Sequence, residues 1–271
     1  MRKKFSLVLL ISQDVIFKPF FVYKLIERLK KENLYVSELI EIKRKQKISK
    51  NKKHNNIIWS KFALIQLSFL FFTKKLISIL PIPLFLKWKS TVKLVAKKKG
   101  ISYRFIDNLN DYLKKSNFKK GDILFSFQHQ IIKNPDDYNF ELINCHPGDL
   151  SLYRGIKPIF WAMIDQQEFA TISVHYIDKG IDTGQLILGE KFKLTMSLAD
   201  NYLEAYNFAP KVVAKAIIKL INNNSINRKS VYKNLGSYKN GPDKVKISNF
   251  YNAGFTTKLS FMNFLRLLKC F

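Results

Sequence analysis

Residues 143–155 read INCHPGDLSLYRG, a short apolar run that ends abruptly in polar residues and a turn. Pro147 cannot donate to a sheet ladder, so it stops the expected strand directly after His146. Asn144 and His146 occupy alternate positions, and in extended geometry their side chains point to the same side. An amide and an imidazole placed together at the end of a strand indicate a functional site.

Similar short apolar runs recur on both sides of this stretch, and helical patterns separate them. Strands are expected at 5–12, 35–42, 104–106, 122–127, 141–145, 171–177 and 185–194, with the clearest helices at 17–31, 158–167 and 198–221. This alternation predicts the α/β class, with a Rossmann-like, mainly parallel twisted sheet flanked by helices. Ligands of such sheets bind beyond the carboxyl ends of the strands. The NCH and DKGIDTG segments both lie at the carboxyl ends of expected strands, so both are expected at that edge.

The composition fits one substantial core. The chain has 271 residues, of which 47% are hydrophobic and 14% aromatic, and this excludes a disordered chain. We expect a principal domain over 1–230, interrupted by an insertion at 43–99, and a C-terminal extension over 231–271. No G-x-G-x-x-G motif follows the first expected strand and no P-loop is present, so neither a dinucleotide nor a nucleoside triphosphate fingerprint is found.

The first residues and the cysteines bear on the compartment. The start, MRKKFSLVLLIS, has a short apolar centre and no small-x-small cleavage site, so we expect a core strand rather than a signal peptide. Cys145 and Cys270 give neither a disulfide framework nor a zinc spacing. A reducing, cytoplasmic location without a metal site is therefore expected.

The positive charge is concentrated in one part of the chain. The formal net charge is +27, and the sequence holds no acid between Glu41 and Asp107 against 17 Lys or Arg. This acid-free segment includes the expected insertion, which opens with the basic stretch KRKQKISKNKKHNN and continues as an apolar, aromatic-rich stretch. The basic excess therefore belongs to a definite region and not to the composition as a whole.

The insertion at 43–99 leaves two interpretations open. Its longest apolar run, Phe62–Phe72, is too short to span a bilayer. Aromatic-rich helices with lysines could lie in a membrane interface, at the inner face of the cytoplasmic membrane. Alternatively, a helical insertion could pack on the core or on a second protomer of a homodimer. The tail FTTKLSFMNFLRLLKCF has the same apolar and basic character.

Asp182 completes a possible catalytic set. It follows His146 by 36 residues, enough for one helix and one strand, and it lies between Gly180 and Gly184, where the backbone can approach a ligand closely. An Asn–His–Asp set suits acyl transfer to an amine. The amide and a protonated imidazole can donate hydrogen bonds to an oxyanion, and one such donor changes the rate by about 10²–10³-fold. The carboxylate raises the pKa of the imidazole and can accept the proton of the amine, directly or through a water.

The segments NCHPGDLSLYRGIKPIFWAM and TISVHYIDKGIDTGQLI resemble the signature of the folate-dependent formyltransferases, which include the glycinamide ribonucleotide, methionyl-tRNA and sugar N-formyltransferases. The N-x-H-P motif matches Asn144, His146 and Pro147. The tyrosine-arginine-glycine loop matches Tyr153–Gly155, and the late D-x-G matches Asp182 and Gly184.

This resemblance implies N10-formyltetrahydrofolate as the formyl donor and an amine as the acceptor. It implies that Asn144 and His146 stabilise the oxyanion and that Asp182 is the partner of His146. By position, the pterin is expected against the backbone after Phe127, with Gln130 and Ile131, and against the turn formed by Asp178 and Gly180.

The acceptor is less closely defined. Gly148–Ser151 replace the usual serine-leucine-leucine-proline stretch, which helps to shape the acceptor side. The tRNA enzyme needs a further C-terminal domain, and the residues after the last expected core helix are too few to form one. The likeness therefore favours the sugar branch. The acceptor is then an amino sugar, nucleotide-linked or lipid-linked, in cell-surface polysaccharide biosynthesis. A methionyl-tRNA formyltransferase-like enzyme and a non-catalytic membrane-surface binding protein on the same fold remain the alternatives.

Overall fold

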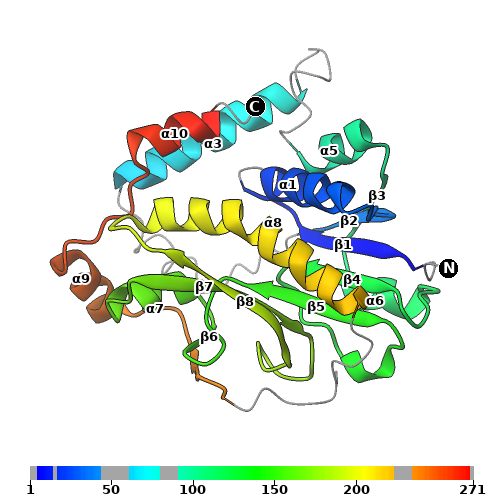
Figure 1. Ribbon diagram of the computed structural model, residues 1–271. Helices are drawn as coiled ribbons and strands as arrows, with labels where there is room; N and C mark the ends of the chain where they lie inside the picture. Colours follow the sequence, from blue (N-terminus) through cyan, green and yellow to red (C-terminus); the bar gives the residue numbers. More distant parts are fainter. Residues whose placement is uncertain (1–4, 15–16, 44–60, 80–90, 223–233, 269–271) are drawn as a thin grey trace.

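The computed structural model describes residues 5–14, 17–43, 61–79, 91–222 and 234–268. Its centre is a seven-stranded sheet in the order β3-β2-β1-β4-β5-β7-β8 (Figure 1). The strands are β1 (Leu7–Ser12), β2 (Glu38–Ile42), β3 (Ser102–Ile106), β4 (Ile123–Phe127), β5 (Glu141–His146), β7 (Phe169–Tyr176) and β8 (Leu186–Lys193). β3, β2, β1, β4 and β5 run parallel, whereas β7 and β8 are antiparallel to their neighbours. The predicted Rossmann-like, mainly parallel sheet is confirmed.

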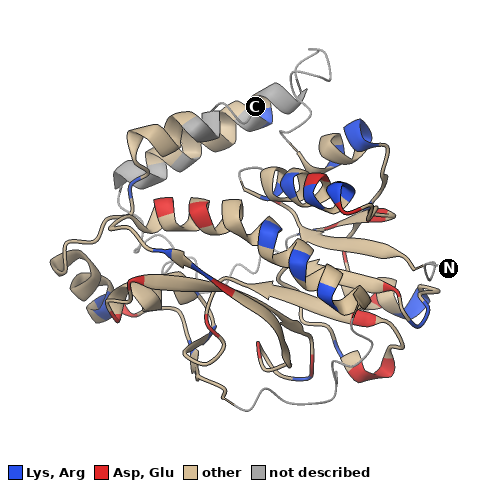
Figure 2. Ribbon diagram, in the orientation of Figure 1, with Lys and Arg blue, Asp and Glu red and all other residues tan. Residues whose placement is uncertain are grey.

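Helices cover mainly one face of this sheet. The helices are α1 (Lys18–Lys31), α3 (Lys61–Ile79), α5 (Val92–Lys99), α6 (Leu109–Lys115), α7 (Pro158–Ile164), α8 (Leu198–Asn222), α9 (Lys244–Asn252) and α10 (Phe261–Leu268), with a short 3-10 turn at Pro135–Asp137. In Figure 1, α1 and α8 lie together on one side of the sheet and α6 lies on the other. Figure 2 shows that Lys and Arg line α1, α5 and the second half of α8.

Alternating strand residues build a core on each face. Phe21, Leu25 and Leu29, the predicted apolar face of α1, are all fully buried and pack with Phe125 of β4 in the larger core. Leu124, the next residue along β4, belongs to a smaller core beneath α6. Because successive side chains of a strand point to opposite faces of the sheet, the same strand contributes residues to both cores. On the face of the sheet that carries the smaller core, the side chains of β5 and β7 include polar ones.

The described part of the 43–99 insertion is helical, as predicted. Thr91 caps α5 by accepting a hydrogen bond from Leu94 N–H at 3.2 Å, and Gly100, at φ +65°, ends it. α3 lies beside α10 above the helical layer (Figure 1). Among the described residues, none of the helices is long and apolar enough to cross a membrane. Residues 44–60 and 80–90 of the expected insertion lie outside the described part.

The expected C-terminal extension is integrated with the rest of the chain. β9 (Ser237–Lys239) pairs with β6 (Tyr153–Gly155) in a second, two-stranded sheet. Phe250 of α9 is 1% exposed and stacks on Phe160 of α7, with ring centroids 5.0 Å apart. Segment 234–252 therefore shares the larger core. The division of the chain at residue 230 stays a prediction.

Truncating Phe250 tests this integration. We expect Phe250→Ala to lower the free energy of unfolding by about 3–5 kcal/mol, because it leaves a cavity against Phe160. Val245→Ala on the same helix, at a side chain that is 67% exposed, should change it by less than about 0.5 kcal/mol. Urea unfolding followed by circular dichroism measures both. Equal, small effects would mean that α9 is not part of the cooperative core.

Candidate active site

The polar side chains of β5 and β7 share one face of the sheet. Ile143 and Cys145 point into the larger core, so Asn144 and His146 face the opposite side. On the antiparallel neighbour β7, His175 lies directly opposite Asn144, and their side-chain nitrogens are 3.3 Å apart. The expected placement of Asn144 and His146 on one side of the strand is therefore confirmed, and this face carries the candidate site.

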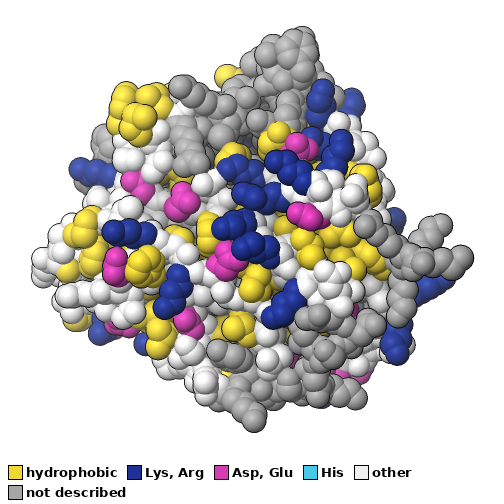
Figure 3. Space-filling view, viewed as in Figure 1, with side chains coloured by type: hydrophobic (Ala, Val, Ile, Leu, Met, Phe, Trp, Pro, Cys, Tyr) yellow, Lys and Arg dark blue, Asp and Glu magenta, His cyan; other side chains and the backbone are white. Residues whose placement is uncertain are grey.

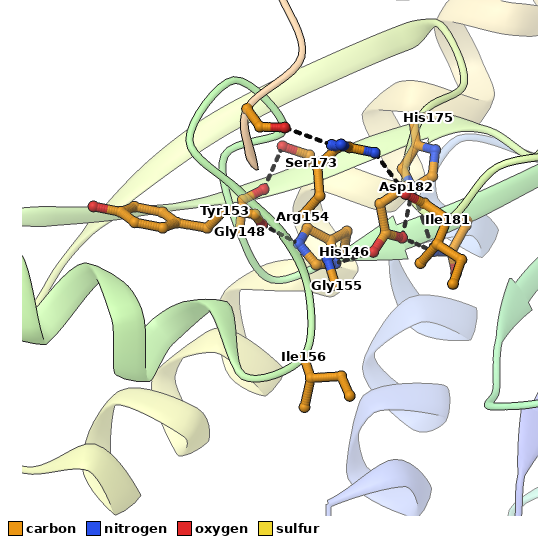
Figure 4. Close-up of polar contacts among 12 residues, drawn as sticks. His146, Gly148, Tyr153, Arg154, Gly155, Ile156, Ser173, His175, Ile181 and Asp182 are labelled. Carbon is orange, nitrogen blue, oxygen red and sulfur yellow. Dashed lines mark hydrogen bonds and ion pairs between the residues drawn. The ribbon is translucent and has the colours of Figure 1, made fainter. Parts of the chain in front are cut away.

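The carboxylate of Asp182 joins these side chains. Its Oδ2 lies 3.4 Å from Nδ1 of His146 and accepts a hydrogen bond from Gly155 N–H at 2.9 Å. Its Oδ1 lies 3.5 Å from Nε2 of His175 and accepts a hydrogen bond from the Asn144 amide at 3.5 Å. Figure 4 shows His146, His175 and Gly155 arranged around this one carboxylate. The structure thus brings together the three residues predicted as the catalytic set.

The route by which Asp182 reaches the site differs from the prediction. β7 is antiparallel to β5, and Ile177 N–H donates to the Leu142 carbonyl at 2.9 Å. Loop 178–184 therefore leaves the sheet beside the amino half of β5, and folds back over the sheet face to bring Asp182 to Asn144. The expectation that NCH and DKGIDTG leave at the same carboxyl edge is wrong, because an apolar pattern does not give the direction of a strand.

The glycines of this loop serve its own packing. A Cβ at Gly184 would lie 1.9 Å from the Tyr176 carbonyl oxygen, and a Cβ at Gly180 would lie 2.0 Å from Oγ1 of Thr183. The space that we expected a ligand to use is thus filled by the chain itself. Between the two glycines, Asp182 adopts φ +52°, a left-handed conformation that Asp takes more readily than most non-glycine residues.

The Tyr153–Gly155 loop holds Asp182 in place. Besides the Gly155 bond, Arg154 Nη1 donates to the Ile181 carbonyl at 3.3 Å, and Arg154 Nε donates to the Gly236 carbonyl at 2.7 Å. Gly155 itself is at φ +89°, where a side chain would be strained. The arginine of the family signature therefore ties three backbone segments together beside the carboxylate.

Gly148 allows this loop to close over His146. Nε2 of His146 lies 2.7 Å from the Tyr153 carbonyl oxygen, and the imidazole is 4% exposed. A Cβ at Gly148 would lie 2.4 Å from Cβ of Pro158 and 2.7 Å from Nε2 of His146. The replacement of the usual serine by glycine therefore removes the side chain that would keep the loop and the ring apart.

Burial and charge set the protonation of the site. Burial alone would raise the pKa of Asp182, but the hydrogen bond from His175 and the charges of His146 and His175 lower it to about 2, with help from the Gly155 N–H. Burial lowers the pKa of His146, although Asp182 and the Tyr153 carbonyl act in the opposite direction. Each ring nitrogen of His146 faces an oxygen acceptor, and a neutral ring can donate to only one of them.

The expected donor-binding residues of β4 lie next to this site. Ser126 pairs with Asn144, so the chain after Phe127 begins beside the amide. The ring of Phe127 packs on the helical side, against Phe21, and its carbonyl accepts a hydrogen bond from the buried Lys18 ammonium at 2.9 Å. Only the backbone of Phe127 is thus directed to the site edge.

The remaining expected donor contacts lie in two turns. Gln130 accepts a hydrogen bond from Leu109 N–H at 3.0 Å, so its side chain secures the start of α6, and Ile131 is 69% exposed. Asp178 accepts hydrogen bonds from Gly180 N–H at 3.1 Å and from Thr183 Oγ1 at 2.6 Å. Both turns are shaped by their own side chains, and their role in donor binding stays a prediction.

His175 is a residue of the site that was not predicted from the sequence. Its Nδ1 lies 2.7 Å from the Tyr176 carbonyl oxygen, which leaves Nε2 directed to Asp182 and Asn144. A signal was present in the alternation along β7, where Thr171, Ser173 and His175 are polar and Ile172, Val174 and Tyr176 pack in the core. Across the described ranges, no group of three His, Cys, Asp or Glu is placed to hold a metal ion.

A Rossmann-like sheet thus presents an amide, an imidazole and a carboxylate within hydrogen-bonding reach of one another. Comparison with known proteins relates part of this chain to one class of group-transfer enzymes. Residues 123–217 match the family model described as formyl transferase. Over this segment, about a third of its length, the chain is similar to the folate-dependent formyltransferases.

The similarity to curated relatives is local. The methionyl-tRNA formyltransferase of Orientia tsutsugamushi (strain Boryong) is 36% identical over 80 residues, which are 30% of this chain and 25% of that protein. The chain therefore spans only a quarter of the length of this relative.

Solved structures share the fold over most of the chain. The N-formyltransferase from Helicobacter canadensis, in complex with folinic acid and dTDP-3-aminofucose, is similar with a TM-score of 0.56 and 15% identity, over 95% of this chain and 85% of that one. Glycinamide ribonucleotide transformylase 1 from Symbiobacterium toebii gives a TM-score of 0.54 and 13% identity, over 86% and 94%. At these identities the likeness establishes the fold.

The close approach at Gly184 gives a test of the loop. Gly184→Ala places a Cβ against the Tyr176 carbonyl and should lower the free energy of unfolding by more than about 2 kcal/mol. Gly241→Ala is the matched control, because a Cβ there meets nothing within 4 Å. Urea unfolding of both variants distinguishes them, and a stable Gly184→Ala protein would show that the loop is free to relax.

The lowered pKa of Asp182 predicts an acid-dependent stability. Ionised Asp182 stabilises the folded state above its ordinary pKa of 3.8, and this contribution of roughly 2 kcal/mol is lost as the pH falls toward about 2. Asp182→Asn should therefore be less stable than the wild type at pH 6, and the difference should shrink between pH about 4 and about 2. Urea unfolding along this pH series measures it. Parallel stability curves would contradict the assignment.

Proposed function

We propose that this protein transfers a formyl group from N10-formyltetrahydrofolate to the primary amine of an amino sugar. The observation that carries the proposal is the meeting of Asn144, His146 and Asp182 on one face of the sheet, with the Asp182 carboxylate within 3.5 Å of both partners. An amide donor, an imidazole and an ionised carboxylate are the groups that acyl transfer to an amine needs.

Asn144 and Asp182 have different roles in the proposed reaction. A bond forms between the amine nitrogen and the formyl carbon, and the bond from that carbon to N10 of the folate breaks. Asn144 donates a hydrogen bond to the oxyanion formed between these two events. Asp182 accepts the proton of the attacking amine, directly or through a water, and N10 gains one proton as it leaves, so the reaction is balanced. Because the pKa of Asp182 is lowered to about 2, the carboxylate is ionised at neutral pH.

His146 must change partners to act on the oxyanion. Its Nε2 lies 2.7 Å from the Tyr153 carbonyl, so donation to a substrate oxygen requires exchange of this contact. Asp182 remains at Nδ1 and favours the protonated ring while negative charge develops on the substrate. The loop closed over the ring is then the part of the site that moves during binding.

The position of β4 supports the folate donor. The 128–131 turn begins beside Asn144, because Ser126 and Asn144 are neighbours in the parallel β4–β5 pair. A pterin against the backbone of this turn, with Gln130 and Ile131 and with the Asp178 and Gly180 turn, would place the N10-formyl group of the folate near Asn144. The Helicobacter canadensis neighbour binds folinic acid, a formylated folate, on the same fold.

The proposal of a sugar acceptor is supported by the same structural neighbour, which binds dTDP-3-aminofucose. The acceptor would be a nucleotide-linked or lipid-linked amino sugar used in cell-surface polysaccharide biosynthesis, and the protein would act in the cytoplasm as a peripheral membrane protein. A homodimer is compatible with this proposal.

A methionyl-tRNA formyltransferase-like activity is the second candidate. The observation that favours it is the 36% identity to the Orientia tsutsugamushi enzyme, together with the net charge of +27, which would attract RNA phosphates. A third possibility, a non-catalytic membrane-surface binding protein, predicts that Asn144, His146 and Asp182 can be replaced without consequence.

Single-turnover release of tetrahydrofolate decides between these functions. The wild type is mixed with N10-formyltetrahydrofolate and a panel of nucleotide-linked amino sugars, lipid-linked amino sugars or methionyl-tRNA. We expect turnover with an amino sugar, and a loss of about 10²–10³-fold in Asn144→Ala and at least as much in His146→Ala. Folate binding, measured by fluorescence, should persist in both variants. Asn252→Ala, an exposed asparagine on α9, is the matched control and should retain full activity.

Each result has a definite meaning. Turnover with methionyl-tRNA alone would replace the sugar assignment and keep the formyl transfer. Equal activity of His146→Ala and the wild type would overturn the catalytic set. Absence of both folate binding and turnover would leave the non-catalytic alternative.

A further inference from the structure

One side of α3 exposes a stripe of large apolar side chains. Ile65 is 66% exposed, Phe69 51%, Phe72 67% and Leu76 53%. These residues are spaced by four, three and four positions, so they lie along a single face of the helix. Contiguous exposed apolar surface of this kind marks interaction sites.

Another side of α3 is anchored to the rest of the fold, so the stripe stays exposed. Leu70 is fully buried in a small cluster with Leu203 of α8 and Leu259. Gln66 makes two hydrogen bonds with the backbone of Leu259, donating to its carbonyl at 3.2 Å and accepting from its N–H at 3.0 Å. Rotation of the helix to bury the stripe would break this anchor. The exposed face is therefore a fixed feature of the fold.

α10 extends the same apolar surface. Phe261 is 71% exposed and Met262 is 74% exposed, and the ring of Phe264 lies 6.0 Å from that of Phe69. Figure 3 shows hydrophobic side chains gathered at the upper left, over the position of α10 in Figure 1. We use the name α3–α10 surface for Ile65, Phe69, Phe72, Leu76, Phe261 and Met262.

The two segments that carry this surface hold charge of a single sign. α3 comes from the segment between Glu41 and Asp107, which has 17 Lys or Arg and no acid, and α10 comes from residues 244–271, which have five Lys or Arg and no acid. On α3 itself, Lys75 is exposed beside Leu76, and its ammonium lies 5.9 Å from the ring centroid of Phe71. An apolar face within wholly cationic segments is complementary to a partner that is apolar inside and anionic outside.

We propose that the α3–α10 surface docks on an anionic lipid bilayer, with its aromatic stripe among the acyl chains and its lysines at the headgroups. A second copy of the same surface would bring like charges together, which is unfavourable at short range. RNA would satisfy the lysines and leave the aliphatic side chains in water. An anionic bilayer satisfies both parts of the surface, as it does for amphipathic helices that lie in the interface.

Co-sedimentation with vesicles tests this docking. The full chain is mixed with vesicles of phosphatidylcholine alone, or of phosphatidylcholine containing about one third phosphatidylglycerol. We expect binding to the anionic vesicles that weakens as salt is added, and at least tenfold weaker binding by Phe69→Gln/Phe72→Gln. Phe105→Gln is the matched control, because Phe105 is a 46% exposed phenylalanine on the edge strand β3, and it should bind like the wild type.

The outcomes separate this inference from the proposed function. None of the α3–α10 surface residues belongs to the candidate active site, so vesicle binding is measured whether or not formyl transfer occurs. Absence of wild-type binding to anionic vesicles at low salt overturns the proposal. So does equal binding by the Phe69/Phe72 variant. Self-association that the same variant abolishes, without vesicle binding, would identify the surface as a protein interface instead.

Discussion

The buried carboxylate of Asp182 is the contact on which the site depends. It joins Asn144 and His146 of β5, His175 of β7 and the backbone of Gly155, so four separate contacts meet at two oxygen atoms. An ionised carboxylate with little exposure is stable only where such donors surround it. The loops that cover this face of the sheet are therefore positioned by the same charge that takes part in the proposed chemistry. Loss of that charge would affect both the stability of the fold and the reaction.

Much of this arrangement could be predicted from local pattern. Apolar runs located the seven strands of the large sheet, and the period of two along β5 placed Asn144 and His146 on one side. The direction of β7 could not be predicted, because a buried strand has the same pattern in either sense. His175 was missed for a related reason: its role follows from its cross-strand register with Asn144, and register is a tertiary property.

In the insertion, too, some features could be predicted from the sequence and others could not. Its composition predicted helices, and the described part contains α3 and α5. Composition could not show which side of α3 is buried, since apolar residues surround the helix on all sides. The anchor of Gln66 on Leu259 decides this, and it joins segments 193 residues apart. The pairing of α3 with the C-terminal helix therefore depended on a contact that no local sequence window contains.

The order of the layers has a consequence for how substrates arrive. From one side to the other, the molecule stacks α3 and α10, then α1 and α8, then the sheet, and last the loops around Asp182 (Figure 1). A protein resting on a bilayer through its outermost helices would hold its reactive groups on the far side of the sheet, turned toward the aqueous phase. Such an orientation favours an acceptor that diffuses in from solution over one that is held in the bilayer.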